Sequence, residues 1–466
     1  MSYPPTLVDS NTDTSHLVLG IDFGTTNSSA AVYVNDKVQI IDVDPRNTNP
    51  TTLKSSIFIT KDQEVIVGQK AIDTYIEKFE GQEIQSDFRL TDDYLAGEAN
   101  KEGETMLERL VEEYEINLPG RFIISPKRVM PNPYFTGTEV FEKLYTPEDL
   151  ATFILQEVKN KAGAQLNTNI KNVNIGRPVH FSDIGEDDLA IERITTAAKR
   201  VGFENIQFTF EPVGAAHSFA IKNNENKIGL VFDFGGGTFD TSVVEFYPDH
   251  SIKVLDSQGV YVGGNKFNEN LIVSKFMQYF GRDITWGPHH MKLPEWIIES
   301  ASKWELSQMM RKKDKIEMIE NIRRQSTSPN LVENLLKLIR FNLGLSLFLT
   351  AEKSKIDLSQ MEYTDVLDLK WMKYSISIEE KINQEEFKKL MWQDMARIGG
   401  SIRKVLENTN LDYEDIQVVI KTGGSSRTFF IQEFLQNLFP NAEIYENDSY
   451  TDVTAGLAVS GSKLFK

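Results

Sequence analysis

The chain has 466 residues, no cysteine and a formal net charge of −18 at pH 7. A chain of this length exceeds one compact core, so we expect two domains or lobes. Proteins bind nucleic-acid phosphates and anionic membranes through clustered Lys and Arg. The excess of acidic residues therefore argues against both as partners. The absence of cysteine excludes disulfides, thiolate zinc sites and cysteine nucleophiles.

The N-terminal segment carries no pattern of a targeting signal. Residues 1–17 are polar, without a basic stretch followed by an apolar one, and we expect them to be flexible. No later run approaches the roughly 18 consecutive apolar residues of a membrane span. We therefore expect a cytoplasmic monomer that binds neither membrane nor nucleic acid.

The N-terminal part predicts a sheet followed by helical segments. Residues 16–58 alternate apolar and polar side chains between turns, which is typical of a meandering antiparallel sheet. Residues 78–119 are acidic, with helical spacing and little strand character, so we expect a helical surface elaboration. Over 145–164 a capping Thr146, followed by proline and two acids, predicts a helix.

Further along, strands and helices alternate and the plan repeats. The expected elements are strands at 172–181 and 207–210, helices at 187–201 and 211–221, a second alternating segment at 229–245, a helix-rich stretch at 268–358, and helices after turns or acidic loops within 416–439 and 450–465. A sheet with helices, followed by a second sheet with helices, is the layout of a duplicated α/β protein.

Two hairpins share one pattern, in which an apolar run leads to Asp-Phe-Gly, small or hydroxyl residues, and a second run. They are VLGIDFGTTNSSAAVYV at 18–34 and GLVFDFGGGTFDTSVVE at 229–245. A polyphosphate with Mg²⁺ needs close backbone N–H groups, hydroxyls and carboxylates that hold the metal through water. Glycine turns permit that approach because they carry no Cβ. One such hairpin is compatible with an ordinary acidic turn, but two facing hairpins would clamp one nucleotide, and the chain contains no GxxxxGK[ST] loop.

The paired hairpins resemble the two phosphate loops of the actin, hexokinase and Hsp70 ATPase superfamily. Further motifs resemble the Hsp70 nucleotide-binding domain: IDFGTTNS at 21–28, TLKSSIFITKDQEVIVGQKA at 52–71, SPKRV at 125–129, EPVGAA at 211–216, DFGGGTFD at 233–240, VGGN at 262–265, AEKSKIDLS at 351–359 and TGGSSR at 422–427. They follow the family order over nearly the whole chain. The resemblance implies an α/β, two-lobed, duplicated actin-like ATPase fold, RNase H-like, with a nucleotide cleft between the lobes.

The resemblance also implies how the chain is divided. Lobe I would cover 18–224 and be completed by a C-terminal helix within 446–466, and lobe II would cover 225–445. The sequence stops at Lys466 without an apolar linker or a β-sandwich. It thus resembles short bacterial Hsp70-like proteins that consist of the nucleotide-binding domain, and we expect no substrate-binding domain.

Roles at the matching positions are implied by the same resemblance. Asp22 and Asp233 would hold Mg²⁺ through water, and Lys127 would lie against the γ-phosphate. Glu211 and Asp240 would position ions and the attacking water. The implied nucleotide contacts are Gly24, Thr25, Thr26, Asn27, Gly235, Gly236, Gly237, Thr238, Gly263, Gly264, Glu352, Lys355, Ser359, Gly423, Gly424, Ser425 and Arg427. The implied cofactors are ATP or ADP and Mg²⁺, with K⁺ as a further ion.

Some of these positions admit simpler interpretations or depart from the family. Taken alone, Lys127 is compatible with a surface lysine, and Glu352 with Lys355 forms an ordinary i,i+3 helix pair. Ile356 stands where Hsp70 proteins carry an arginine that stacks on adenine, which leaves the base preference open. Asn265 replaces the usual acid after the Gly-Gly turn.

Four functions are compatible with these patterns. The first is a slow ATP-hydrolysing, chaperone-like switch whose unknown protein partner reads the angle between the lobes. The others are an actin-like filament former, a small-molecule kinase, which would need an aspartate base beside an acceptor pocket, and a nucleotide-binding pseudo-ATPase. Insertions around 80–120 and 285–345 would interrupt a uniform filament interface, and the lysine motif favours the switch.

Overall fold

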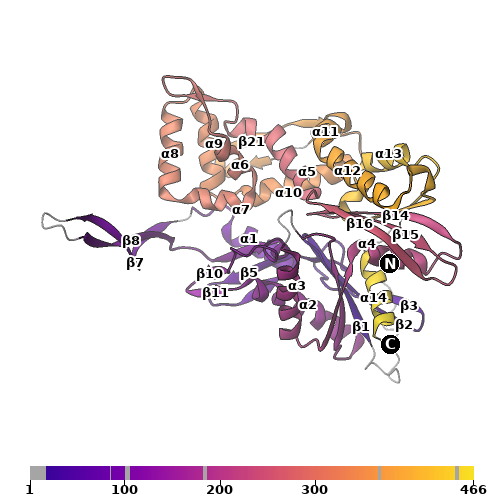
Figure 1. Ribbon diagram of the computed structural model, residues 1–466. Helices are drawn as coiled ribbons and strands as arrows, with labels where there is room; N and C mark the ends of the chain where they lie inside the picture. Colours follow the sequence, from indigo (N-terminus) through magenta and orange to yellow (C-terminus); the bar gives the residue numbers. More distant parts are fainter. Residues whose placement is uncertain are drawn as a thin grey trace.

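A computed structural model of the protein describes residues 17–83, 85–99, 105–181, 186–365, 369–446 and 451–465. The expectation of a flexible N-terminus therefore falls almost entirely outside the described residues. Within the described ranges, none of the helices combines the length and apolar character needed to cross a membrane. Figure 1 shows two bodies of sheet and helices that lie one above the other, with the ends of the chain on the same side.

Two large sheets have the same topology. The first has the order β13-β12-β1-β2-β3, with β4 beside β2, and the second has the order β24-β23-β14-β15-β16. The strands are β1 (Val18–Phe23), β2 (Asn27–Val34), β3 (Lys37–Ile40), β4 (Leu53–Lys54), β12 (Asn172–Arg177), β13 (Asn205–Phe210), β14 (Lys227–Phe234), β15 (Phe239–Phe246), β16 (Ile252–Val260), β23 (Val418–Thr422) and β24 (Glu443–Glu446). In each sheet the central strand pairs antiparallel with the next strand and parallel with a much later one. This repetition confirms the duplicated α/β plan.

Helices surround both sheets and agree with most of the predicted segments. In the first part they are α1 (Gln69–Phe79), α2 (Pro147–Leu166), α3 (Asp187–Arg200) and α4 (Glu211–Ala220). In the second part they are α5 (Gly264–Leu271), α6 (Glu295–Ser302), α7 (Trp304–Ser307), α8 (Lys313–Arg324), α9 (Pro329–Arg340), α10 (Gly344–Leu358), α11 (Gln384–Leu390), α12 (Trp392–Thr409), α13 (Phe429–Leu438) and α14 (Asp452–Leu464). Helix α2 starts with the predicted cap, since Thr146 and Asp149 form a capping box.

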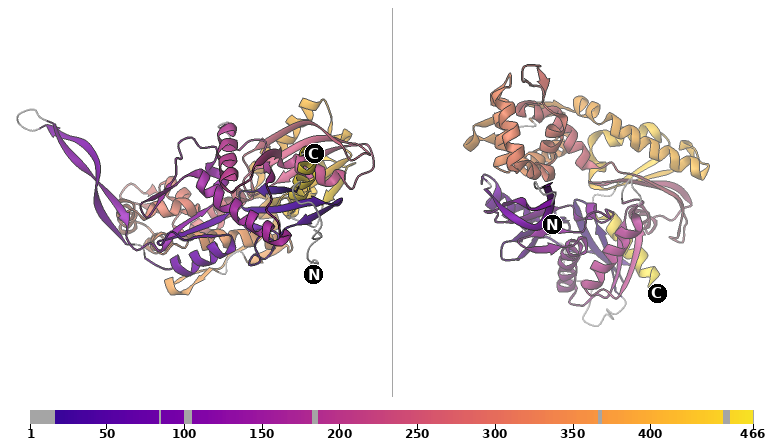
Figure 2. Two further views of the ribbon diagram at one scale, coloured as in Figure 1. Left: turned by 90° about the horizontal axis from the view of Figure 1, so that it is seen from below. Right: turned by 60° about the vertical axis from the view of Figure 1, so that its left-hand side comes forward.

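The segment 78–119 differs from its prediction. After α1 the chain forms β7 (Ser86–Ala99) and β8 (Thr105–Glu115), an antiparallel hairpin that projects far from the body (Figures 1 and 2). The helical prediction is wrong: the two segments pair as antiparallel strands, with the backbone of Leu90 opposite Val111, although their many glutamates favour a helix.

Smaller sheets complete the fold. A three-stranded sheet has the order β6-β5-β9 and consists of β5 (Ser56–Thr60), β6 (Val65–Val67) and β9 (Gly120–Ile124). The two-stranded pairs are β10 (Thr138–Val140) with β11 (Lys143–Tyr145), β17 (Thr285–Trp286) with β18 (Met291–Lys292), β19 (Tyr363–Asp365) with β22 (Lys381–Asn383), and β20 (Leu369–Trp371) with β21 (Ile376–Ile378). Thus β5, expected in the first sheet, belongs to a separate one.

Helices α4 and α14 cross between the two large sheets. Helix α14 packs against β1 and β2 of the first sheet, and α4 packs against β14 and β15 of the second. The helices touch through Gly214 and Gly456, where a Cβ on Gly456 would overlap the carbonyl oxygen of Gly214. The C-terminal helix of the chain therefore joins the first sheet, as Figure 1 also shows.

A second contact joins the two bodies away from this crossing. Residues of β5, α1 and β9 form one buried apolar cluster with Trp304 and Leu345 of α7 and α10. The ring centroids of Phe122 and Trp304 lie 5.5 Å apart. The two bodies are thus also in contact at this apolar cluster.

Candidate functional site

The turns of the two hairpins face each other. The first turn joins β1 to β2 and the second joins β14 to β15. A Cβ on Gly237 would lie 2.7 Å from Thr25 Oγ1, and a Cβ on Gly236 would overlap Thr26 Oγ1. A side chain at either glycine would therefore separate the turns. The structure thus brings together the hydroxyls of the turn at 24–27 and the glycines of the turn at 235–238, which lie far apart in the sequence.

Neighbouring groups hold the first turn in place. The Ser55 hydroxyl donates to the carbonyl oxygen of Gly24 at 2.7 Å, and the Ser55 N–H donates to that of Thr26 at 2.9 Å. Thr26 Oγ1 is buried and makes no hydrogen bond to any residue that the structure describes. A buried hydroxyl usually has a partner, so this oxygen is available to a ligand between the turns. Ser55 was not singled out from the sequence, although it lies in the TLKSS segment.

The second turn is held by two further predicted segments. The N–H of Gly264 donates to the carbonyl oxygen of Gly235 at 3.0 Å, and that of Asn265 donates to Gly236 at 2.9 Å. The Ser425 hydroxyl also donates to the carbonyl oxygen of Gly235, at 2.8 Å. The Gly-Gly turn and the loop after β23 therefore meet at the second hairpin.

Lys127 is buried beside the turns in an ion pair. Its Nζ lies 2.6 Å from Glu211 Oε1, and the two side chains are only 7% and 11% exposed. The lysine follows β9 through Ser125, which has a left-handed φ of 52°, and lies in a 3₁₀ turn over Pro126–Val129. Glu211 is the first residue of α4. This burial excludes the interpretation of Lys127 as a surface lysine.

Four acidic side chains gather around Lys127, and the charges of two of them, Glu211 and Asp240, also act on Arg177. Burial, with the charge of Glu211, raises the pKa of Asp22 and of Asp240 to about 7, although Lys127 lowers both. The same causes raise the pKa of Asp233. Burial lowers the pKa of Lys127, but the charges of Glu211, Asp22 and Asp240 outweigh it, so the net shift is upward. The cluster therefore lacks positive charge, which a bound cation would supply.

The donor set fits a hydrated magnesium ion. Nowhere in the described ranges do three or more His, Asp or Glu side chains lie close enough to hold a metal ion directly. Mg²⁺ keeps several of its waters and takes oxygen ligands, so carboxylates that contact it through water suit this arrangement. Asp22 and Asp233 occupy corresponding positions near the ends of β1 and β14.

The predicted adenosine segments lie next to the second turn. Nζ of Lys355, a buried residue of α10, donates to the carbonyl oxygen of Gly264 at 3.2 Å, and burial lowers its pKa. Gly423 has a φ of 83°, and a Cβ there would lie 2.8 Å from Asp233 Oδ1. Lys355 is therefore not part of an exposed surface pair, and the loop that starts at Gly423 runs directly beside the acidic cluster.

The remaining predicted adenosine residues are placed less tightly. The Ser359 hydroxyl donates to the carbonyl oxygen of Lys355 within its own helix, and Arg427 Nε lies 3.9 Å from Glu446 Oε1. Glu352 is partly exposed on α10, and its charge acts on Lys355. Ile356 is 51% exposed. These residues lie in or next to the two predicted adenosine segments. The hydrogen bond of Ser359 and the ion pair of Arg427 are made to other groups of the protein.

The raised pKa values predict a pH-dependent stability of the nucleotide-free protein. An ordinary aspartate has a pKa of 3.8, so Asp22 and Asp240, at about 7, bind protons more tightly in the folded state. The stabilising contribution is fully present below about pH 4 and is lost as the pH rises through about 7. We expect the melting temperature to fall between about pH 5 and about pH 8, because the carboxylates must then ionise in the folded protein.

The variant Asp240→Asn should weaken this pH dependence, since an amide oxygen can still accept the 2.8 Å hydrogen bond from the Val179 N–H. Asp62→Asn, at an exposed turn, is the matched control. Melting curves of the three proteins across this range measure the effect. A slope that Asp240→Asn leaves unchanged would contradict the assignment to this cluster.

Comparison with known proteins agrees with this geometry. The family model described as Hsp70 protein matches residues 18–324 and 344–464. The chain is 25% identical over 459 residues to proteins named "Chaperone protein DnaK" from Thermotoga petrophila, Thermotoga maritima and Thermotoga neapolitana. These alignments cover 96% of this chain and 59% of each relative, so the chain spans somewhat over half of their length. The matched segments contain both hairpins, the buried lysine and both predicted adenosine segments, and the chain belongs to the Hsp70 family.

Proposed function

We propose that this protein is an ATP-binding, slowly ATP-hydrolysing molecular switch, chaperone-like in its chemistry. The observation that carries the proposal is the close approach of the two turns. The side chains of Thr26 and Thr25 lie so near Gly236 and Gly237 that neither glycine could carry a side chain. Such turns supply backbone N–H groups and hydroxyls to a polyphosphate. The neighbouring acidic cluster, with a single lysine, would accept the accompanying cation.

Each part of the site has a proposed role. Gly24 to Asn27 and Gly235 to Thr238 would hold the phosphates, and the adenosine segments around Lys355 and Ser425 would hold the nucleoside. Asp22 and Asp233 would hold Mg²⁺ through water, and the ion would neutralise charge on the phosphate oxygens. Lys127 would stabilise charge that develops during transfer. Glu211 and Asp240 would orient the water, with K⁺ as a further ion.

The switch would work through the angle between two lobes. We propose lobe I as 18–224 with the C-terminal helix within 446–466, and lobe II as 225–445. Contacts between them include the packing of α4 on β14 and β15, the apolar cluster around Trp304, and the hydrogen bond from the Val179 N–H to Asp240 Oδ1 at 2.8 Å. A nucleotide that touches both hairpins would favour the closed arrangement, and a protein partner would read the difference. The partner would be a protein of the kind that Hsp70 proteins bind.

Binding of MgATP should stabilise the fold measurably. A ligand that binds only the folded state adds about 3 kcal/mol at a hundredfold excess over Kd. We expect the melting temperature of nucleotide-free protein to rise with MgATP and to return on chelation of the metal. In Gly237→Val the rise should disappear, because the new side chain would meet Thr25, 2.7 Å from the site of its Cβ. A melting curve of the parent that millimolar MgATP does not move would contradict the proposal.

A further inference from the structure

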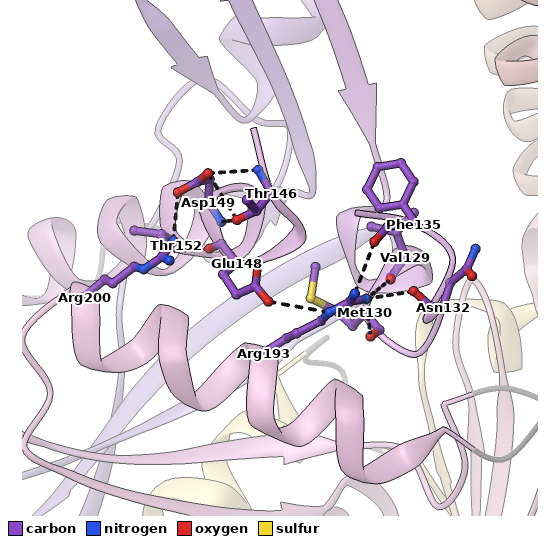
Figure 3. A network of polar contacts seen from close by, with 10 residues as sticks. All are labelled: Val129, Met130, Asn132, Phe135, Thr146, Glu148, Asp149, Thr152, Arg193 and Arg200. Carbon is purple, nitrogen blue, oxygen red and sulfur yellow. Dashed lines mark hydrogen bonds and ion pairs between the residues drawn. The ribbon is translucent and has the colours of Figure 1, made fainter. Parts of the chain in front are cut away.

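We propose that Arg193 is a positioning residue, which holds the chain segment that carries Lys127. Arg193 lies on α3 and is only 8% exposed. Its Nη1 donates to the carbonyl oxygens of Val129 at 3.0 Å, Met130 at 3.0 Å and Asn132 at 2.9 Å, and its Nη2 donates to Phe135 at 3.1 Å. Figure 3 shows the guanidinium enclosed by these four carbonyl groups. The inference rests on the proposed role of Lys127.

The four carbonyl groups belong to the segment that directly follows Lys127. Val129 ends the 3₁₀ turn, and 130–137 has neither helix nor strand. The carbonyl oxygens of Val129 and Asn132 also accept from the N–H groups of Asn132 and Phe135, at 3.3 Å and 3.2 Å, so Arg193 adds a donor that connects these short turns. Arginine suits the task because its planar guanidinium offers five N–H donors and keeps its charge when buried. A lysine in the same place would offer three donors from one point and could not reach all four groups.

The position of Lys127 is therefore fixed from both sides. On the N-terminal side, β9 pairs with β5, and the Ser125 N–H donates to the carbonyl oxygen of Ser55 at 2.8 Å. On the C-terminal side, Arg193 holds the chain. Since a lysine side chain is long and flexible, its ammonium group can be held accurately only if the backbone beneath it does not move. Loss of the second anchor would let the Lys127 backbone shift relative to the hairpins.

An ion pair also orients the guanidinium group of Arg193. Arg193 Nε lies 3.5 Å from Glu148 Oε1, in the first turn of α2. The same turn contains the capping box of Thr146 and Asp149, and Arg200 Nη1 lies 2.8 Å from Asp149 Oδ1 (Figure 3). The network connects α2, α3 and the lysine segment. Arg200 pairs with the same turn of α2 but makes no contact with the lysine segment in Figure 3, which makes it a matched control.

The expected effect of Arg193→Met is a lower rate of hydrolysis with little change in nucleotide affinity. A misplacement of about 1 Å can slow a reaction about a hundredfold, so we expect a decrease of about ten- to a hundredfold in the single-turnover rate of folded, ATP-bound protein. Arg193→Lys should recover part of the rate, because it keeps the charge and some of the donors. Arg200→Met should keep the parent rate.

Two measurements separate positioning from a merely structural role. In a Lys127→Ala background, Arg193→Met should slow hydrolysis no further, because both changes act on the same group. Independent and additive losses would overturn the proposal, as would a parent-like rate in Arg193→Met alone. Amide hydrogen exchange over residues 126–135 should be faster in Arg193→Met and unchanged in Arg200→Met. This second readout needs no activity: if the parent protein does not hydrolyse ATP, the proposed function fails, and unchanged exchange would still overturn the anchoring.

Discussion

Replacing Lys127 by alanine should lower the single-turnover rate of ATP hydrolysis by about 10²- to 10³-fold, the range for removal of one preorganised electrostatic group. The affinity for ATP should change much less, because the ammonium group acts mainly on charge that develops in the transition state. The structure supports this expectation, because Lys127 is buried next to both turns and its Nζ lies 2.6 Å from Glu211 Oε1. Rate and affinity are to be measured on the same preparations.

The same substitution also affects the fold, and the controls must account for it. Removing Lys127 leaves Glu211 buried without its partner, a change that can cost about 3–5 kcal/mol of stability. The double variant Lys127→Ala with Glu211→Gln removes that unpaired charge. Lys253→Ala is the matched control, since that lysine side chain is 61% exposed and lies outside the proposed nucleotide-binding segments. A folded Lys127→Ala protein that hydrolyses at the parent rate would refute the role, and a parent that binds ATP without turnover would support the pseudo-ATPase.

The duplicated fold was predictable because its signals are local. Each hairpin shows its two strands and its turn within one stretch of sequence, and the order of motifs along the chain adds the rest. The facing of Thr25 and Thr26 with Gly236 and Gly237 follows from those motifs only when the two copies are considered together. The prediction succeeded where one short segment contained both the strand pattern and the chemistry.

What the sequence did not reveal depends on contacts between distant segments. Arg193 contacts carbonyl groups some sixty positions earlier in the chain, and backbone acceptors leave no signature in the sequence. Ser55 supports the first turn through its own backbone and hydroxyl, and many serines look alike. The hairpin of β7 and β8 was mistaken for a helix because its glutamates favour helices, whereas the register of paired strands decides the structure there.

A substitution at the crossing of α4 and α14 has a large expected effect on stability. In Gly456→Ala the new methyl group would overlap the carbonyl oxygen of Gly214 and lie 2.9 Å from the backbone nitrogen of Ser218. These are backbone atoms of a helix, which cannot rotate away as a side chain can, so α4 and α14 must move apart. Helix α14 is also packed on β1, so the movement would disturb the first sheet.

We expect Gly456→Ala to lower the free energy of unfolding by about 3 kcal/mol or more, because overpacking against a rigid group exceeds the usual cost of one extra methyl. Alanine stabilises a helix by about 1 kcal/mol relative to glycine, and this gain partly offsets the cost of the overlap. The measured change in the free energy of unfolding is the difference between the two contributions. Gly400→Ala is the matched control: this glycine also lies inside a helix, α12, but a Cβ there would meet nothing within 4 Å. Its substitution should therefore raise stability by up to about 1 kcal/mol. Urea unfolding of the three proteins measures both changes, and equal stability of Gly456→Ala and the parent would show that the helices do not cross as closely as the structure places them.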